Sequence, residues 1–210
     1  MRPLFLFVLG GVCAFAQPFT AGIKLGAPLD DFLNTIQDPT INYHSVTNRY
    51  LVGPTVELRL PFGLGVEVDA LYRHYNFQGA GNISPAGTTL TTHGSTGAWE
   101  FPLLAKYRFP FPVVRPFVDA GVAWDTLQGF KQVVTVVSGV PVLPPANLNQ
   151  PAHNTTTGFV TGAGLDVHAP YVHLSPEIRY TRWGAQHFFS PNGGFSSNQN
   201  QVEVLLGITF

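Results

Sequence analysis

The chain has 210 residues and a net charge of −1, and only 11% of its residues are charged, against about a quarter in an average soluble domain. The near-zero net charge leaves no basic surface of the kind that binds nucleic acid, so a nucleic-acid partner is not expected. Beyond the N-terminus, no stretch approaches the about 18 consecutive apolar residues of a membrane-spanning helix. With 22 glycines and 17 phenylalanines, the composition fits an apolar all-β domain or a membrane β-barrel.

Residues 1–16, MRPLFLFVLGGVCAFA, have the pattern of a cleaved secretory signal peptide. Arg2 supplies the positive start, an apolar run too short to span a bilayer follows, and Ala-Phe-Ala ends it as a cleavage site. Cleavage after Ala16 would export residues 17–210 and remove Cys13, the only cysteine. An acylated Cys13 is disfavoured because valine, and not a small residue, precedes it. The mature domain is therefore expected to hold together without disulfides.

Apolar and polar residues then alternate with the period of a β-strand, and helical spacing is not sustained in any of these stretches. In the first of them, Ile23 and Leu25 share one face, and Lys24 has the other. In a membrane barrel the apolar face meets lipid and the polar face lines the lumen. We predict an all-β protein, an eight-stranded antiparallel up-and-down transmembrane β-barrel with strands at 19–29, 50–60, 65–77, 98–109, 115–125, 158–169, 172–183 and 201–210.

The connections between these strands alternate in length. Those after the second, fourth and sixth strands are short, and those after the odd-numbered strands are long, at 30–49, 78–97, 126–157 and 184–199. Outer-membrane barrels have tight periplasmic turns and long external loops, so both termini are expected on the periplasmic side. QVVTVVSGVPVL (132–143) is interpreted as an extension of the fifth and sixth strands into a hairpin that turns at Ser138-Gly139.

Charges are confined to the polar face of the predicted strands. Within the eight segments only Arg182 has the apolar parity, and it stands at a segment end. This distribution is what the cost of a charge at the bilayer midplane requires. Arg115 and Asp125 share the polar parity with the residues predicted to form the charge network of the barrel interior: Lys24, Glu57, Arg59, Glu67, Asp69, Arg73, Glu100, Lys106, Arg108, Asp119, Asp166, Glu177, Arg179 and Glu203.

Two further residue types bear on the barrel. Proline removes a ladder donor, so Pro116 is expected to begin a strand, and Pro54, Pro102 and Pro176 to mark bulges or strand ends. Aromatic residues gather at both ends of the segments and match two interfacial girdles. The turn-side girdle would contain Phe19, Phe62, Phe109, Phe111, Tyr171 and Phe210, and the loop-side girdle Tyr50, Tyr72, Trp99 and Trp124.

The signal, the eight amphipathic strands and the stretches WEFPLLAKYRF, RPFVDAGVAWD and VEVLLGITF resemble the bacterial outer-membrane β-barrel family, in particular its eight-stranded OmpA/OmpX-type domains. The resemblance implies the bacterial outer membrane as the location and its lipid bilayer as a partner. It also implies a C-terminal membrane-insertion signal that the outer-membrane assembly machinery reads, formed by Val204, Leu206, Ile208 and Phe210.

The interior charges have two interpretations. The set is nearly balanced in sign, which favours a paired plug because buried charges persist only when paired. A narrow passive channel for small or apolar solutes is the alternative. The long loops, rich in Asn, Thr, Ser, Gly and Pro, are expected to carry a structural or surface-interaction role toward an unknown ligand, with the protein a monomer.

Enzymatic and metal-binding functions are less favoured by the sequence. His168 and His173 flank a turn on the inward parity, but solvated histidines at turns are much more common than metal sites. His93 and Ser95 invite comparison with outer-membrane lipid A deacylases, yet no carboxylate stands at a motif spacing. A non-enzyme without cofactor or metal is therefore expected, and a lipid-modifying enzyme ranks third.

Overall fold

The structure is a computed structural model that describes residues 19–30, 33–35, 41–45, 50–83, 88–137, 154–168, 172–187 and 195–210. The predicted signal peptide, Tyr171 and the Ser138-Gly139 turn lie outside these residues. No helix among the described residues is long and apolar enough to cross a membrane.

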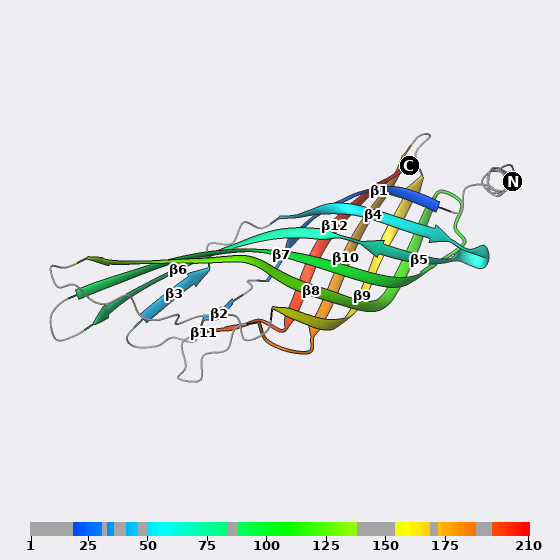
Figure 1. The fold of residues 1–210 in the computed structure, drawn as a ribbon. Coiled ribbons are helices and arrows are strands. Elements are labelled where there is room, and N and C mark those ends of the chain that lie inside the picture. Colours follow the sequence, from blue (N-terminus) through cyan, green and yellow to red (C-terminus); the bar gives the residue numbers. More distant parts are fainter. Residues whose placement is uncertain are drawn as a thin grey trace, which may run out of the picture.

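Antiparallel strands close into a barrel (Figure 1). Around the ring the order is β1-β12-β10-β9-β8-β7-β5-β4, and β4 pairs back onto β1. β6 follows β5 in the same place between β4 and β7, so β5 and β6 together count as one barrel strand. The ring therefore has eight barrel strands, which confirms the predicted fold class. The strands are β1 (Phe19–Pro28), β4 (Leu51–Arg59), β5 (Leu64–Asp69), β6 (Leu71–Ile83), β7 (Thr88–Arg108), β8 (Val114–Val137), β9 (Thr155–His168), β10 (His173–Trp183) and β12 (Asn200–Thr209).

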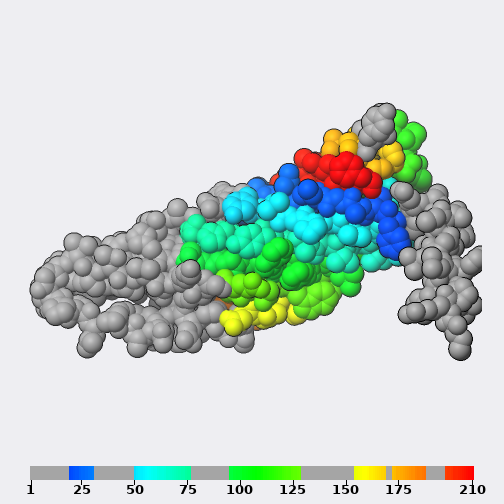
Figure 2. Space-filling view, turned by 45° about the horizontal axis from the view of Figure 1, so that its top comes forward, coloured from blue at the N-terminus to red at the C-terminus, as the bar shows by residue number. Residues whose placement is uncertain are grey.

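The C-terminal strand closes the ring. β12 pairs with β1 in a register that places Ile208 opposite Ile23, and the backbone N–H of Phe210 donates to the carbonyl of Ala21 at 3.0 Å. In Figure 2 the first and last strands of the ring, β1 and β12, lie side by side on one face, and β4 follows on the other side of β1. Closure leaves no free edge within the ring, as a membrane-spanning sheet requires.

The barrel is apolar outside and charged inside. Ile23 and Ile178 are 52% and 60% exposed, whereas Lys24 and Arg179 on the alternate parity are 2% and 0% exposed. This inversion of a soluble protein follows from the strict period of two, because successive side chains of a strand point to opposite faces.

The predicted third strand is interrupted at Ala70, which divides it into β5 and β6. The ladder to β7 stops at Val68 and resumes at Leu71, while the Ala70 N–H still donates to the carbonyl of Pro54 at 3.0 Å. Pro54 in β4 and Pro102 in β7 flank this break, and neither has a backbone N–H to give to the ladder.

The other two prolines lie where the expectation places them. Pro116 is the third residue of β8, close to the start of the strand, and is paired with Leu165. Pro176 is paired with Leu206 of β12, but the β9–β10 ladder passes from Leu174 to Glu177 without a pair for Pro176. The bulge in the β7–β8 ladder lies between Ser95 and Gly97, away from every one of the four prolines.

The prediction that 78–97 is a loop is wrong for its described residues, 78–83 and 88–97. β6 and β7 remain paired out to Ile83 and Thr88, and β7 pairs with β8 out to Thr89 and Val137. These strands project beyond the barrel on the side away from the C-terminus (Figure 1). The alternating, Thr- and Val-rich sequence explains the extension, because β-branched residues favour a pleated surface.

Two additional strand pairs form within the other predicted loops. β3 (Ile41–Ser45) adds to β6, and β2 (Leu33–Thr35) pairs with β11 (Phe195–Ser197). The predicted extension of the fifth strand is confirmed as far as Val137, where β8 pairs with β7. The second arm of the predicted hairpin lies outside the described residues.

The opposite end has tight turns. A 3-10 turn at Pro61–Gly63 joins β4 to β5, and both Phe62 and Gly63 have positive φ values of 64° and 81°. The Phe62 side chain is 92% exposed, next to the turn at 109–113 that joins β7 to β8. Phe62 thus lies at the turn-side end, where the predicted girdle requires an aromatic residue.

The close approach of β1 and β12 depends on Gly22. A Cβ at this position would lie 2.0 Å from the carbonyl oxygen of Ile208, so the two strands would have to separate. We expect Gly22→Ala to lower the free energy of unfolding by about 1–3 kcal/mol, as over-packing does. Unfolding in urea, followed by heat-modifiable migration of the folded barrel in gels, measures this.

Gly207→Ala provides the matched control on β12, since its added Cβ would meet nothing closer than 3.4 Å. Equal stability losses for the two variants would contradict the role assigned to Gly22.

Candidate functional site

The lumen is the most distinctive feature of the barrel, because each of the eight barrel strands contributes a charged side chain to it. Alternate positions of a strand face inward, so a carboxylate or cation at every second residue reaches the same interior. Of the fourteen residues predicted for the interior network, all except Arg59 are buried, and the Arg59 side chain is 26% exposed. Arg115, at the start of β8, is exposed and has no ion-pair partner among the described residues.

The central cluster, which we define as Lys24, Glu67, Asp69, Lys106, Glu177 and Arg179, lies at mid-barrel. The Lys24 ammonium pairs with Glu67, with Asp69 at 3.0 Å and with Glu177 at 3.2 Å. Lys106 pairs with the second oxygen of Glu67 and lies 4.3 Å from the centre of the Phe117 ring.

Arg179 joins opposite walls of the barrel. Its guanidinium reaches Asp69 at 2.9 Å and Glu67 at 3.3 Å, and it also holds Glu177 on its own strand at 2.6 Å. Three strands separate β10 from β5 in either direction around the ring, so these contacts cross the full diameter of the lumen. The central cluster is therefore a bridge through the barrel as well as a lining of its wall.

The turn-side cluster is formed by Glu57, Arg59, Arg108, Asp166 and His173. Arg108 binds both oxygens of Glu57 and donates from Nε to Asp166 at 2.9 Å. Such a two-pronged contact fixes the orientation of both partners.

A loop-side cluster occupies the other end of the lumen. Arg73 pairs with Glu100 and, at 3.1 Å, with Glu203, and Gln201 donates to Glu203. The indole N–H of Trp183 in turn donates to Gln201 at 3.1 Å, which accounts for the inward position of this tryptophan.

His187 is an interior residue that the strand pattern did not predict. Its Nε2 lies 3.0 Å from Asp125 and 3.4 Å from the hydroxyl of Thr156, and the residue is 3% exposed. It belongs to none of the predicted strands, so period-two reasoning gave no reason to place it inside. Asp119 is also buried, and neither of its oxygens has a hydrogen-bond partner within the described part of the chain.

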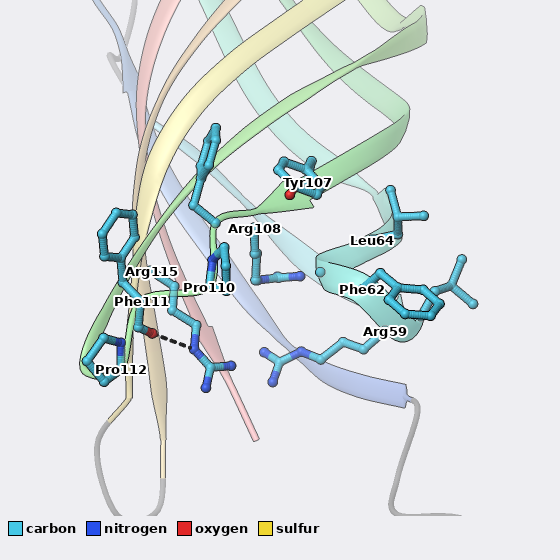
Figure 3. Close-up of a pocket in the computed structure, with 12 residues that line it drawn as sticks. Arg59, Phe62, Leu64, Tyr107, Arg108, Pro110, Phe111, Pro112 and Arg115 are labelled. Atoms are coloured by element: carbon cyan, nitrogen blue, oxygen red, sulfur yellow. Dashed lines mark hydrogen bonds between the residues drawn. The ribbon is translucent and has the colours of Figure 1, made fainter.

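A cavity of about 790 Å³ opens at the turn side, between the β4–β5 and β7–β8 turns (Figure 3). Arg59, Arg108 and Arg115 line it together with Phe62 and Phe111, and none of its described lining residues is acidic. Arg115 donates from Nε to the carbonyl of Phe111 at 3.2 Å.

The other predicted site residues lie on the outer face and at the ends of the barrel strands. The insertion-signal residues Val204 and Leu206 face outward from β12, and Phe210 is 68% exposed beyond its end. His168 and His173 meet across the β9–β10 ladder with ring centroids 3.7 Å apart. His93 and Ser95 belong to β7 and not to a loop, which corrects their expected setting.

The chain is similar to known outer-membrane proteins. The family described as outer membrane protein beta-barrel domain matches residues 15–190. The comparison with curated proteins finds no match.

Among solved structures, the outer membrane protein OprG from Pseudomonas aeruginosa is similar over 91% of this chain and 92% of its own, with 13% identity and a TM-score of 0.56. Neisserial surface protein A aligns over 92% of this chain and 96% of its own, with 14% identity and a TM-score of 0.44. At this level of identity, the likeness to OprG shows the fold alone.

Replacing Arg179, which links β10 to Glu67 and Asp69 on the opposite wall, tests the central cluster. In Arg179→Ala the carboxylates of Glu67, Asp69 and Glu177 lose a cation that is fully buried, and we expect the free energy of unfolding to fall by about 3–5 kcal/mol. The measurement is urea unfolding of the barrel refolded in lipid vesicles.

Arg182→Ala is the matched control, because Arg182 stands on the same strand with an exposed, outward side chain. It should change stability by less than about 1 kcal/mol. A loss in Arg179→Ala no larger than in Arg182→Ala would contradict the bridging role.

Proposed function

Because the chain belongs to the family of outer-membrane β-barrel domains, we propose that it is a plugged barrel that carries a β-sheet projection at the cell surface, with a structural or surface-interaction role. The observation that carries the proposal is the ion-paired bridge across the lumen. Solute passage would have to break contacts among Lys24, Glu67 and Arg179, which are almost wholly buried.

Electrostatics support a plug that stays closed. Separating a buried ion pair leaves uncompensated charges in a poorly hydrated space, which costs several kcal/mol per pair. The three clusters follow one another along the barrel from the turn side to the loop side, so a solute would meet this cost repeatedly.

The working part in this proposal is the projection formed by β3 and the distal halves of β6, β7 and β8. On the up-and-down arrangement of the family, the end with long strand extensions faces outward from the cell. Among the described residues, β3 and β8 are the outer strands of this projection, and outer strands offer backbone groups to a partner chain. Adhesive or scaffolding contacts are therefore the expected activity.

An enzymatic role has weaker support. The nearest approach to a hydrolase triad in the described residues is Thr156, His187 and Asp125, but both contacts use Nε2 of the histidine. A triad needs one ring nitrogen for the nucleophile and the other for the carboxylate. This arrangement is also buried inside the barrel, away from the lipid on which an outer-membrane lipid-modifying enzyme acts.

Single-channel recording in planar bilayers tests the plug against the channel. The wild-type barrel is expected to give no stable openings, because the bridge between β5 and β10 occupies the lumen. Stable openings whose size or ion selectivity changes in Glu67→Gln or Arg73→Gln would identify a conducting pathway through these groups and refute the plug.

Shortening the projection tests the surface role. Gly79 and Thr92 are paired in the β6–β7 ladder, so residues 80–91 can be replaced by an Asn-Gly hairpin turn without a change of register. We expect cells that display the shortened barrel to lose most of their attachment to immobilised matrix glycoproteins and to one another.

Heat-modifiable migration and surface labelling of the shortened protein control for folding and export. Undiminished attachment at equal surface levels would count against the projection as the working part.

A further inference from the structure

The turn-side mouth of the lumen brings together one carboxylate and two imidazoles at the end of the ion-paired interior. We propose that Asp166, His168 and His173 form a binding site for a divalent transition-metal ion, with Zn²⁺ as its reference ligand. The proposal stands independently of the surface role, because it concerns the other end of the barrel.

Strand geometry presents the three side chains to one point. His168 and His173 are direct partners in the β9–β10 ladder, and Asp166 lies two residues before His168, so all three share the inward parity. One ligand atom from each residue lies within 4.8 Å of the others. Bonds to zinc of about 2.0–2.2 Å place ligand atoms about 3.3 Å apart, so modest side-chain rotations complete the site. His168 is exposed and His173 half-buried, which leaves both rings room to rotate.

The carboxylate is already positioned for a ligand. Arg108, itself fixed by Glu57, donates from Nε to one oxygen of Asp166 at 2.9 Å. The other oxygen, Oδ1, has no hydrogen-bond partner among the described residues, although Asp166 is only 2% exposed. Oδ1 lies 3.5 Å from Nδ1 of His173, so the unsatisfied lone pairs face the histidine pair. This is the arrangement by which outer groups orient a metal-binding carboxylate.

Arg59 supplies the positive charge at this point. Its terminal nitrogen lies 3.4 Å from Nδ1 of His173 and 3.8 Å from Asp166. Because a guanidinium only donates, a hydrogen bond from Arg59 to His173 uses the tautomer with an unprotonated Nδ1, and this is also the form that binds a metal. Arg59 is the last residue of β4, and its side chain points into the turn-side cavity beside Arg115 (Figure 3). It can withdraw toward that cavity when a metal ion replaces it.

The donor set selects the class of ion. Two imidazole nitrogens and one carboxylate oxygen suit Zn²⁺, Cu²⁺, Ni²⁺ or Co²⁺, whereas Ca²⁺ and Mg²⁺ prefer sites built from oxygen alone. Three protein ligands leave a further position for water. A bound ion would tie the ends of β9 and β10 together beside their connecting turn, and so reinforce the rim of the barrel.

Titration calorimetry with Zn²⁺ on the full chain, refolded in detergent micelles, tests the site. The wild type should bind one ion, and His168→Gln and His173→Gln should each weaken binding by at least about tenfold, the loss expected when a metal site loses a supporting group. Arg59→Gln should bind several-fold more tightly, because the competing guanidinium is gone. His74→Gln, on the outward parity of β6, is the matched control and should bind like the wild type.

Heat-modifiable migration verifies that each variant is folded, and the two histidine variants are at the rim, where folding tolerates a change. Absence of Zn²⁺ binding by the wild type would overturn the proposal. So would undiminished binding by the double variant His168→Gln/His173→Gln, or weaker binding by Arg59→Gln than by the wild type.

Discussion

The closed ladder of backbone hydrogen bonds is the constraint on which the rest of this protein depends. A bilayer interior offers no water to an unpaired N–H or carbonyl, so the first and last strands must pair, as β1 and β12 do. Once the ring is closed, the side chain of each residue in a membrane-spanning strand faces either the lipid or the lumen. The apolar belt and the charged interior are both consequences of that division.

The lumen shows how an eight-stranded barrel fills itself. Its width suits a filling of side chains, and here many of the side chains that face the lumen are charged. Such an interior is costly unless each charge is paired, and the pairs extend across the ring as well as along its wall. Arg179 satisfies both needs, because it contacts Glu177 on its own strand and Asp69 on the opposite strand.

The two ends of the barrel differ in kind. At one end, β6, β7 and β8 leave the ring as a continuing sheet, and β3 adds to it. At the other end, short turns bring Arg59, Asp166 and the two histidines of β9 and β10 to one mouth. We propose a large partner for the first end, at the backbone edges of its described strands, and a small ion for the second, at its side-chain donors.

The sequence by itself determined the number of barrel strands, the face on which each residue of the eight predicted strands lies, and the partnership of the first and last strands. It could do so because apolar residues occupy every second position, as from Val202 to Phe210. In a membrane barrel these positions must face the lipid and the alternate positions must face the lumen. Only the tertiary structure decided which interior charges meet. Lys24, Glu67 and Glu177 are far apart in the chain, and their contacts depend on stagger and barrel diameter.

The same limit applies to the ends of the barrel. The glycines and polar residues of 78–97 are typical of a loop, yet residues 78–83 belong to the β6–β7 ladder and 88–97 to β7, because the neighbouring strands are long enough to pair with them. The inward position of His187 could not be predicted from strand periodicity, because this residue follows β10 in an irregular segment and its side chain contacts Asp125. Alternation fixes the face on which a residue lies, whereas pairing across a closed ring fixes what it touches.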